Sequence, residues 1–145
     1  MTAQAGNRDA RVRVGGAKPQ QLPVPLKLAA NVVLYVHAIV SVDNAGNARP
    51  GRTSTTDKVV GYNEWYVSNA GGIAGAKETE GVSRGIIECE NLEADAVTVA
   101  SIGRDVYLVD DQTVAATNGG NTRIVAGRFW GFDEDTGKAL VEVGG

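Results

Sequence analysis

The clearest alternation of hydrophobic and polar residues lies at residues 96–114, which read AVTVASIGRDVYLVDDQTV. Val97 and Val99 flank a threonine, as in a strand with one buried face. Residues 106–109 are apolar on both faces, which is typical of a strand covered on both sides. The polar residues 110–112 favour a turn, because short carboxylates accept hydrogen bonds from nearby backbone N–H groups. We therefore predict a β-hairpin here and expect the rest of the chain to be organised around it.

Similar short runs predict further strands along the chain. They occupy residues 31–42, 58–67, 81–90, 124–132 and 138–143, with a break expected near residues 61–63. Segments rich in glycine, asparagine and aspartate separate several of them, at residues 43–47, 69–75 and 118–121. Short strands between frequent turns predict an all-β fold: a compact β-sandwich or small β-barrel with at most one or two short helical turns.

The first 29 residues differ from the rest in charge and in proline content. The chain has a net charge of −3, but residues 1–30 hold five basic residues and one aspartate, a local charge of +4, so the other 115 residues carry −7. Three of the four prolines also lie in this basic segment. We predict an extended N-terminal arm over residues 1–29 and a globular β domain over residues 30–145. A partner-seeking arm and a frayed tail are the two interpretations of the segment.

The end of this arm has an alternating apolar pattern. Four apolar residues recur at every second position from residue 22 to residue 28, which places them on one face of an extended chain. Pro23 and Pro25 exclude a helix and cannot donate to a central strand, so the segment should lie at an edge or in a groove, covered by its own domain or by a neighbouring subunit. The predicted partner-binding residues of the arm are Arg11, Arg13, Leu22, Val24, Pro25, Leu26 and Leu28.

The search for reactive groups yields no catalytic, cofactor-binding or metal-binding constellation. His37 lies in an apolar run with no nucleophile or orienting carboxylate nominated nearby. Cys89, the only cysteine, shares a strand face with Ile87 and should be a small buried hydrophobe, while the glutamates beside it face away. The aspartates at 110–111 and at 133–135 are most simply solvated turns. We therefore expect a protein that is not an enzyme and needs no cofactor or metal.

Charge, hydropathy and the aromatic residues narrow the possible partners. A pI near 5.1 argues against a general nucleic-acid binder. The longest apolar run is far shorter than the roughly 18 residues that cross a bilayer, so no membrane partner is expected. Trp65 and Trp130 can belong to the core or to a subunit interface, where tryptophan is enriched, and the sequence does not separate these alternatives.

Four segments of the body resemble the capsid decoration (cement) proteins of tailed bacteriophages. They are VVLYVHAIVSVDNAGNARP (32–50), KVVG (58–61), GRDVYLVDDQTVAAT (103–117) and AGRFWGFDEDTGKALVEV (126–143), whereas residues 1–29 match no pattern of that family. The resemblance implies a non-enzymatic virion protein, made in the host bacterial cytoplasm, that binds the exterior of an assembled capsid. It also implies the major capsid protein as partner, a homo-oligomer, often a trimer, and no catalytic residues.

Two other functions stand beside this expectation. A carbohydrate-binding or host-attachment module of a virion would use exposed Trp65 or Trp130. A small barrel enzyme would need Asp110 or Asp111 in a deep pocket with a perturbed pKa.

Overall fold

The computed structural model describes residues 3–8, 12–13 and 20–144. It is nearly all β, with 41% of residues in strands, which confirms the predicted fold class. Two helical turns occur in the described residues, the 3₁₀ helices η1 (Glu93–Asp95) and η2 (Val99–Ser101). Val99 was predicted to continue a strand from Val97; instead the chain turns into η2 at that position.

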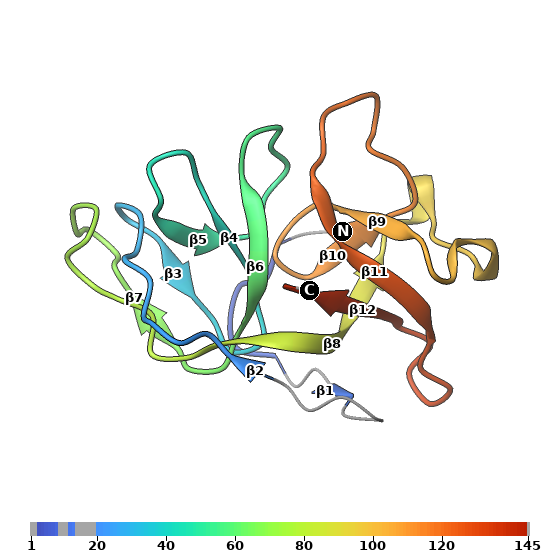
Figure 1. The fold of residues 1–145 in the computed structure, drawn as a ribbon, viewed down its shortest axis with the longest axis horizontal. Coiled ribbons are helices and arrows are strands. Elements are labelled where there is room, and N and C mark those ends of the chain that lie inside the picture. The colour runs from blue at the N-terminus through green and yellow to red at the C-terminus, as the bar shows by residue number, and fades with distance from the viewer. Residues whose placement is uncertain (1–2, 9–11, 14–19, 145) are drawn as a thin grey trace.

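The described strands form one sheet of ten strands and one of two strands (Figure 1). In chain order they are β1 (Val12–Arg13), β2 (Gln20–Gln21), β3 (Val33–Leu34), β4 (Ile39–Val42), β5 (Ala48–Pro50), β6 (Lys58–Asn63), β7 (Val67–Ser68), β8 (Val82–Asn91), β9 (Asp105–Leu108), β10 (Thr113–Ala115), β11 (Val125–Phe132) and β12 (Ala139–Val143). The expected break at residues 61–63 is wrong, because β6 runs through them and the chain leaves the strand only after Asn63.

Five of these strands close into a barrel, in the order β10-β9-β11-β12-β8. β10 closes it, since its residues pair with β9 in antiparallel and with β8 in parallel fashion. The β9–β10 hairpin corresponds to the second part of the hairpin predicted at residues 96–114, and its turn falls at residues 110–112 as expected. Closure leaves the five strands without a free edge between them, which removes the usual site of unwanted strand pairing.

The strand that organises the molecule is β8, not the predicted hairpin. Ile86 and Ile87 pair with both β12 and β1, and Ser83 pairs with both β6 and β2, so strands lie along both edges of β8. Figure 1 shows β12 and β6 on one side of β8, with β1 and β2 on the other. The short N-terminal strands therefore complete the edge of β8 that β12 and β6 leave open.

The hydrophobic core is divided into two clusters. The barrel core contains Ile39, Tyr62, Ile87, Cys89, Val97, Val106, Leu108, Val114, Ala126, Phe129, Ala139, Val141 and Val143. The second cluster, here called the lobe core, contains Leu28, Ala29, Val32, Leu34, Val40, Ala48, Val67 and Val82. It lies between β3, β5, β7 and the first residue of β8, and we call this part of the molecule the lobe.

The end of the predicted arm is part of the lobe. Leu28 and Ala29 are buried in its core, so the expected boundary between residues 29 and 30 passes through this cluster. Residues 26–29 also have backbone partners on both sides: Ala48 N donates to Lys27 O at 2.7 Å, and Leu28 N donates to Lys77 O at 2.9 Å. The segment thus lies between two other chain segments and is bonded to both. The sequence predicted a position at an edge or in a groove.

The predicted apolar face of the arm is interrupted at Val24. Leu22 and Leu26 are half-buried against the lobe core, whereas Val24 is 61% exposed. The chain bends at Pro23 and Val24, and this bend breaks the two-residue alternation that an unbroken extended chain would keep. Val24 therefore points away from the face that it was predicted to share.

Candidate interaction surface

The first described residues are held on the body by hydrogen bonds to the chain around residues 36–37. Gln4 Nε2 donates to Val36 O at 2.9 Å, and Asn7 Oδ1 accepts from Val36 N at 2.7 Å. The guanidinium of Arg8 donates twice to His37 O, at 3.0 and 2.8 Å, and once to Glu88 O on β8, at 2.9 Å. Most of these acceptors are backbone carbonyls, so residues 4–8 bind mainly to the main chain of the body and not to its side chains.

His37 is part of this attachment and does not lie in a strand, which corrects the sequence-based expectation. Its backbone has φ = +66°, a left-handed conformation that turns the chain between β3 and β4. Its Nδ1 lies 3.0 Å from Arg8 O, and because a carbonyl oxygen can only accept, Nδ1 is the protonated nitrogen. The ring serves to hold the N-terminal segment.

Asp111, in the β9–β10 turn, accepts a hydrogen bond from Gln4 N at 2.7 Å. It was predicted to be solvated, but Asp110 and Asp111 are both largely buried. Burial raises the pKa of Asp111 to about 6; the nearby charge of Asp110 adds to the rise, and the Gln4 hydrogen bond and the Arg8 charge oppose it. The N-terminal segment thus meets the barrel at a carboxyl group that titrates within the physiological range.

The arm continues along the open edge of β8. Val12 and Arg13 pair with Ile87 and Ile86, and β2 pairs with Arg84 and Ser83. Leu22 N then donates to Val82 O at 2.7 Å. Of the predicted arm residues, Arg11 lies outside the described residues, and for Arg13 the backbone pairing is described.

An exposed aromatic surface lies beside the end of the arm. Trp65 is 59% exposed and Tyr66 is 49% exposed, and the Tyr66 ring packs against Tyr35 with centroids 5.8 Å apart. Trp65 covers Gly81, where a Cβ would lie 2.8 Å from Trp65 Cδ1 and 3.4 Å from Gln21 Nε2. The absence of a side chain at position 81 thus leaves room for the indole ring next to Gln21 of β2.

Two hollows flank Pro25 next to these aromatic residues. One, of about 620 Å³, lies between Pro25, Tyr66 and residues 76–80. The other, of about 320 Å³, lies between residues 21–25 and residues 79–82. We call the surface formed by Pro23, Val24, Pro25, Trp65 and Tyr66 the arm face. It combines exposed apolar side chains, two neighbouring hollows and two prolines, whose rings fix the backbone angle φ.

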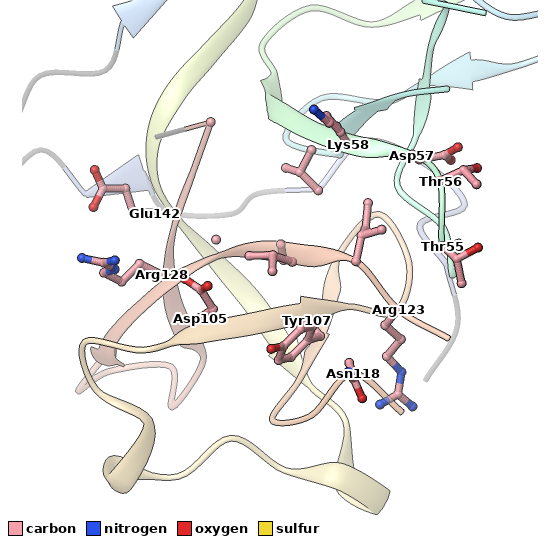
Figure 2. Close-up of a pocket in the computed structure, with 16 residues that line it drawn as sticks. Thr55, Thr56, Asp57, Lys58, Asp105, Tyr107, Asn118, Arg123, Arg128 and Glu142 are labelled. Carbon is pink, nitrogen blue, oxygen red and sulfur yellow. The ribbon is translucent and has the colours of Figure 1, made fainter. Parts of the chain in front are cut away.

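A larger hollow of about 780 Å³ lies between β6 and β11 (Figure 2). Lys58 and residues 55–57 form one side, and Asp105, Tyr107 and Arg128 lie on the other. Its charged lining residues are Lys58, Arg123, Arg128, Asp57, Asp105 and Glu142, three of each sign. Arg52 donates to both carboxylate oxygens of Asp57, at 2.7 and 3.2 Å, and these hydrogen bonds lower the pKa of Asp57. The lining of this hollow therefore has no excess of charge that would favour ions of one sign.

Trp130 lies on β11, apart from the arm face. It is 44% exposed, and its Nε1 donates to Glu142 Oε1 at 2.9 Å. Both tryptophans therefore lie at the surface, and neither belongs to the two core clusters.

None of the three hollows brings together the reactive groups found in the sequence. Cys89 is buried as predicted, and burial raises the pKa of its thiol to about 12. Asp133 was expected in a solvated turn but is buried, and its Oδ1 accepts from the backbone N–H groups of residues 135 and 136. Glu88, which was expected to face away from Cys89, is also buried. None of the three hollows is lined by His37, Cys89, Asp110 or Asp111. Over residues 3–8, 12–13 and 20–144, no group of three or more histidine, cysteine, aspartate or glutamate side chains could hold a metal ion.

Comparisons with known proteins identify no relative. No family model, no curated protein and no solved structure matches the chain. Within the part of the chain that the structure describes, no helix has the length and apolar character needed to cross a membrane.

Sequence reasoning did not find the attachment residues Gln4 and Arg8, or Tyr66 of the arm face. Gln4 and Arg8 lie in a polar stretch with no pattern that indicates docking, because their partners are backbone carbonyls about 30 or more residues away. A signal for Tyr66 was present in the adjacent Trp65-Tyr66 pair, since neighbouring strand residues point to opposite faces and two bulky aromatics cannot both enter one core.

Proposed function

We propose that this protein is a non-enzymatic capsid decoration protein that binds the outer surface of an assembled phage head and stabilises it. The observation that carries the proposal is the arm face, where Val24 and two prolines are exposed close to Trp65 and Tyr66. Exposed aromatic residues in shallow hollows are typical of protein–protein contact sites. The resemblance of the body to decoration proteins names the partner, the major capsid protein.

The structure changes which arm residues we propose for the capsid contact. Leu28 is fully buried, and Leu22 and Leu26 pack on the lobe, so their apolar surface is largely used within the chain. Val24 and Pro25 remain accessible, and Trp65 and Tyr66 extend their surface. Arg11 and Arg13 remain candidates because of their positive charge, which would pair with carboxylates on the capsid.

The stabilising effect would follow from mass action. A protein that binds the assembled lattice more tightly than free capsid subunits adds its binding free energy to the assembled state. A homotrimer, as the resemblance implies, would present three arm faces at once, and this multivalency raises the occupancy reached by weak individual contacts. The proposed location is the capsid exterior, after synthesis in the host bacterial cytoplasm.

Capsid binding by matched tryptophan variants tests this proposal. Emptied heads of the phage that encodes the protein are incubated with wild type, Trp65→Ala, Val24→Asp and Trp130→Ala, and bound protein is measured after sedimentation. We expect Trp65→Ala and Val24→Asp to lower occupancy at least tenfold and Trp130→Ala to leave it unchanged. Equal binding by all four proteins would remove the arm face from the contact, and no binding by wild type would refute decoration.

A carbohydrate-binding module of a virion is the second candidate, and the composition of the arm face favours it. Exposed aromatic rings next to polar groups can stack on sugar rings. Gln21 and Glu80 line the smaller hollow, Gln21 and Trp65 both lie close to Gly81, and Glu64 precedes Trp65 in the chain. In a Trp130→Phe background, Trp65 is the only tryptophan that reports by fluorescence. Saturable quenching of Trp65 fluorescence by a glycan would support this function over capsid binding, provided that calorimetry shows that the Trp65→Ala variant no longer binds the same glycan. Unchanged emission across a broad glycan panel would exclude it.

A further inference from the structure

We infer that the N-terminal arm is exchangeable, so that the open edge of β8 binds the arm of a second copy of this chain in place of its own. The proposal concerns the contact between copies. It holds whether or not the protein decorates a capsid.

The binding site for the arm is the β8 edge opposite β12 and β6. Along this edge, β10 pairs with residues 90–91, Arg8 donates to Glu88 O, β1 pairs with residues 86–87 and β2 with residues 83–84. Three successive contacts of the N-terminal residues, made by Arg8, β1 and β2, thus follow this strand beyond the end that β10 occupies. Without the arm this edge would expose unpaired backbone groups, which is a template for another strand.

The contacts that hold the arm can be made equally well by an identical arm from another copy. The ladder bonds of β1 and β2 join backbone to backbone. The bonds of Gln4 and Arg8 end on Val36 O, His37 O, Glu88 O and the Asp111 carboxylate. Every one of them is restored when the arm moves to the same edge of a second chain, so exchange leaves the number of contacts unchanged.

The segment that would act as the hinge lies at residues 22–25. On one side, Leu26 is anchored by Leu26 N to Thr79 Oγ1 and by Thr79 N to Leu26 O, at 2.9 and 2.8 Å. On the other side, Leu22 begins the attachment to β8 through Val82 O. Between them the chain bends at Pro23 and Val24, both exposed. Proline favours an extended conformation in the residue before it, so straightening this bend directs β2 away from its own β8 edge.

The balance between the two arrangements depends on concentration. In a single chain the arm is tethered next to its own site, which gives it a high effective concentration and favours the closed form in dilute solution. When copies are close together, as at high protein concentration or on a shared surface, the arm of a neighbour competes for the same edge. Exchange then links copies without any new contact surface.

Cysteine trapping across β2 and β8 tests this inference on the full-length chain. Gln20 and Arg84 are exposed register partners, and Arg84 Nη2 donates to Gln20 Oε1 at 2.8 Å. Gln20→Cys and Arg84→Cys are made as separate variants, one of them tagged, and mixed under mild oxidation. We expect a covalent heterodimer whose fraction rises with protein concentration. The native Cys89 is buried and leaves the readout clear.

Two controls decide what the heterodimer means. Gln20→Cys mixed with Thr55→Cys, an exposed position at the β6 hollow, measures random collision and should give at least tenfold less heterodimer. The double variant Gln20→Cys/Arg84→Cys should form its disulfide within one chain when dilute. A heterodimer no more abundant than the collision control, or failure of the double variant to close, overturns the inference.

The rate of exchange provides an independent readout. Arg8→Ala removes three hydrogen bonds that the arm makes in both the closed and the exchanged arrangement. We therefore expect heterodimer to appear several-fold faster in this background while its final fraction stays the same. An unchanged rate would show that cross-linking does not require release of the arm, and would also overturn the inference.

Discussion

The barrel and the lobe solve the problem of strand edges in different ways. In the barrel, β10 pairs with both β9 and β8, so the edge of each barrel strand is paired with another strand of the closed ring. In the lobe, β5 ends the sheet, and its outer edge is covered by residues 27–29 of the N-terminal arm. The barrel core is built from residues 39–143, whereas the lobe core begins at Leu28.

This difference indicates that the two regions depend on the arm to different degrees. The barrel consists of β8 and four strands from the C-terminal half of the chain. It contacts the arm at one edge of β8 and at Asp111. The lobe has arm residues inside its core and inside its hydrogen-bond network. Changes to the arm should therefore affect the lobe first, while changes inside the barrel should affect the whole molecule.

The largest expected effect is that of Phe129→Ala in the barrel. Phe129 is fully buried on β11 and packs edge-to-face against Phe132, with ring centroids 5.1 Å apart. Truncation leaves a cavity, and we expect a loss of about 4 kcal/mol of unfolding free energy. Urea denaturation followed by near-UV circular dichroism measures it. A loss below about 1 kcal/mol would contradict the role of this ring as the centre of the barrel core.

Leu28→Ala should cost less and should act locally. Leu28 is also fully buried, but it lies in the smaller lobe core, and we expect a loss of about 3 kcal/mol. Amide hydrogen exchange should accelerate in β5 and residues 77–79 before it does in β9 and β11, because the lobe can open without the closed barrel. Uniform acceleration over all strands would mean that lobe and barrel unfold as one unit.

Asp111→Asn should stabilise the protein, by an amount that depends on pH. The folded-state pKa of Asp111 is raised from 3.8 to about 6, so the folded state binds the proton more tightly than the unfolded state. Between these values the wild type loses stability as pH rises, and above about 6 it carries the full cost of the buried charge. A shift of roughly two units corresponds to at most about 3 kcal/mol. Asparagine keeps an acceptor for Gln4 N, so we expect a gain of about 1 to 2 kcal/mol at pH 8.

The control for this variant is pH itself. Urea denaturation of both proteins at pH 8 and near pH 3.5 should show the gain at the higher pH and its disappearance at the lower, where wild-type Asp111 is protonated as well. A difference independent of pH would locate the effect in packing.

The smallest expected effect is that of Val24→Ser on the arm face. Because Val24 is mostly exposed, the change in unfolding free energy should stay within about 0.5 kcal/mol. Thermal unfolding measures it beside Leu28→Ala, four residues along the same arm. A cost approaching that of Leu28→Ala would show that Val24 is covered in solution, for example by a second copy.

Much of the fold was predictable from local pattern. In β12 the alternation of Ala139, Val141 and Val143 correctly gave the buried face, since a strand has a two-residue period whatever its partners. The β9–β10 hairpin was predicted from an apolar run followed by short polar turn residues, which is also a local signal. The candidate site was less predictable: Leu28 was assigned to a partner contact, yet the structure buries it within the chain.

What the sequence determined by itself is the class of the molecule, because alternation and turn residues act over a few neighbouring positions. It could not determine that β8 is the shared strand, that the barrel closes through β10, or that Asp111 is buried, because pairing and burial depend on residues that approach from elsewhere in the chain. The bend at Pro23 and Val24 shows where local sequence information ends and the effect of tertiary contacts begins. Each proline was visible in the sequence, but the side of the chain that faces the lobe was decided only when Leu26 and Leu28 found their partners in the folded structure.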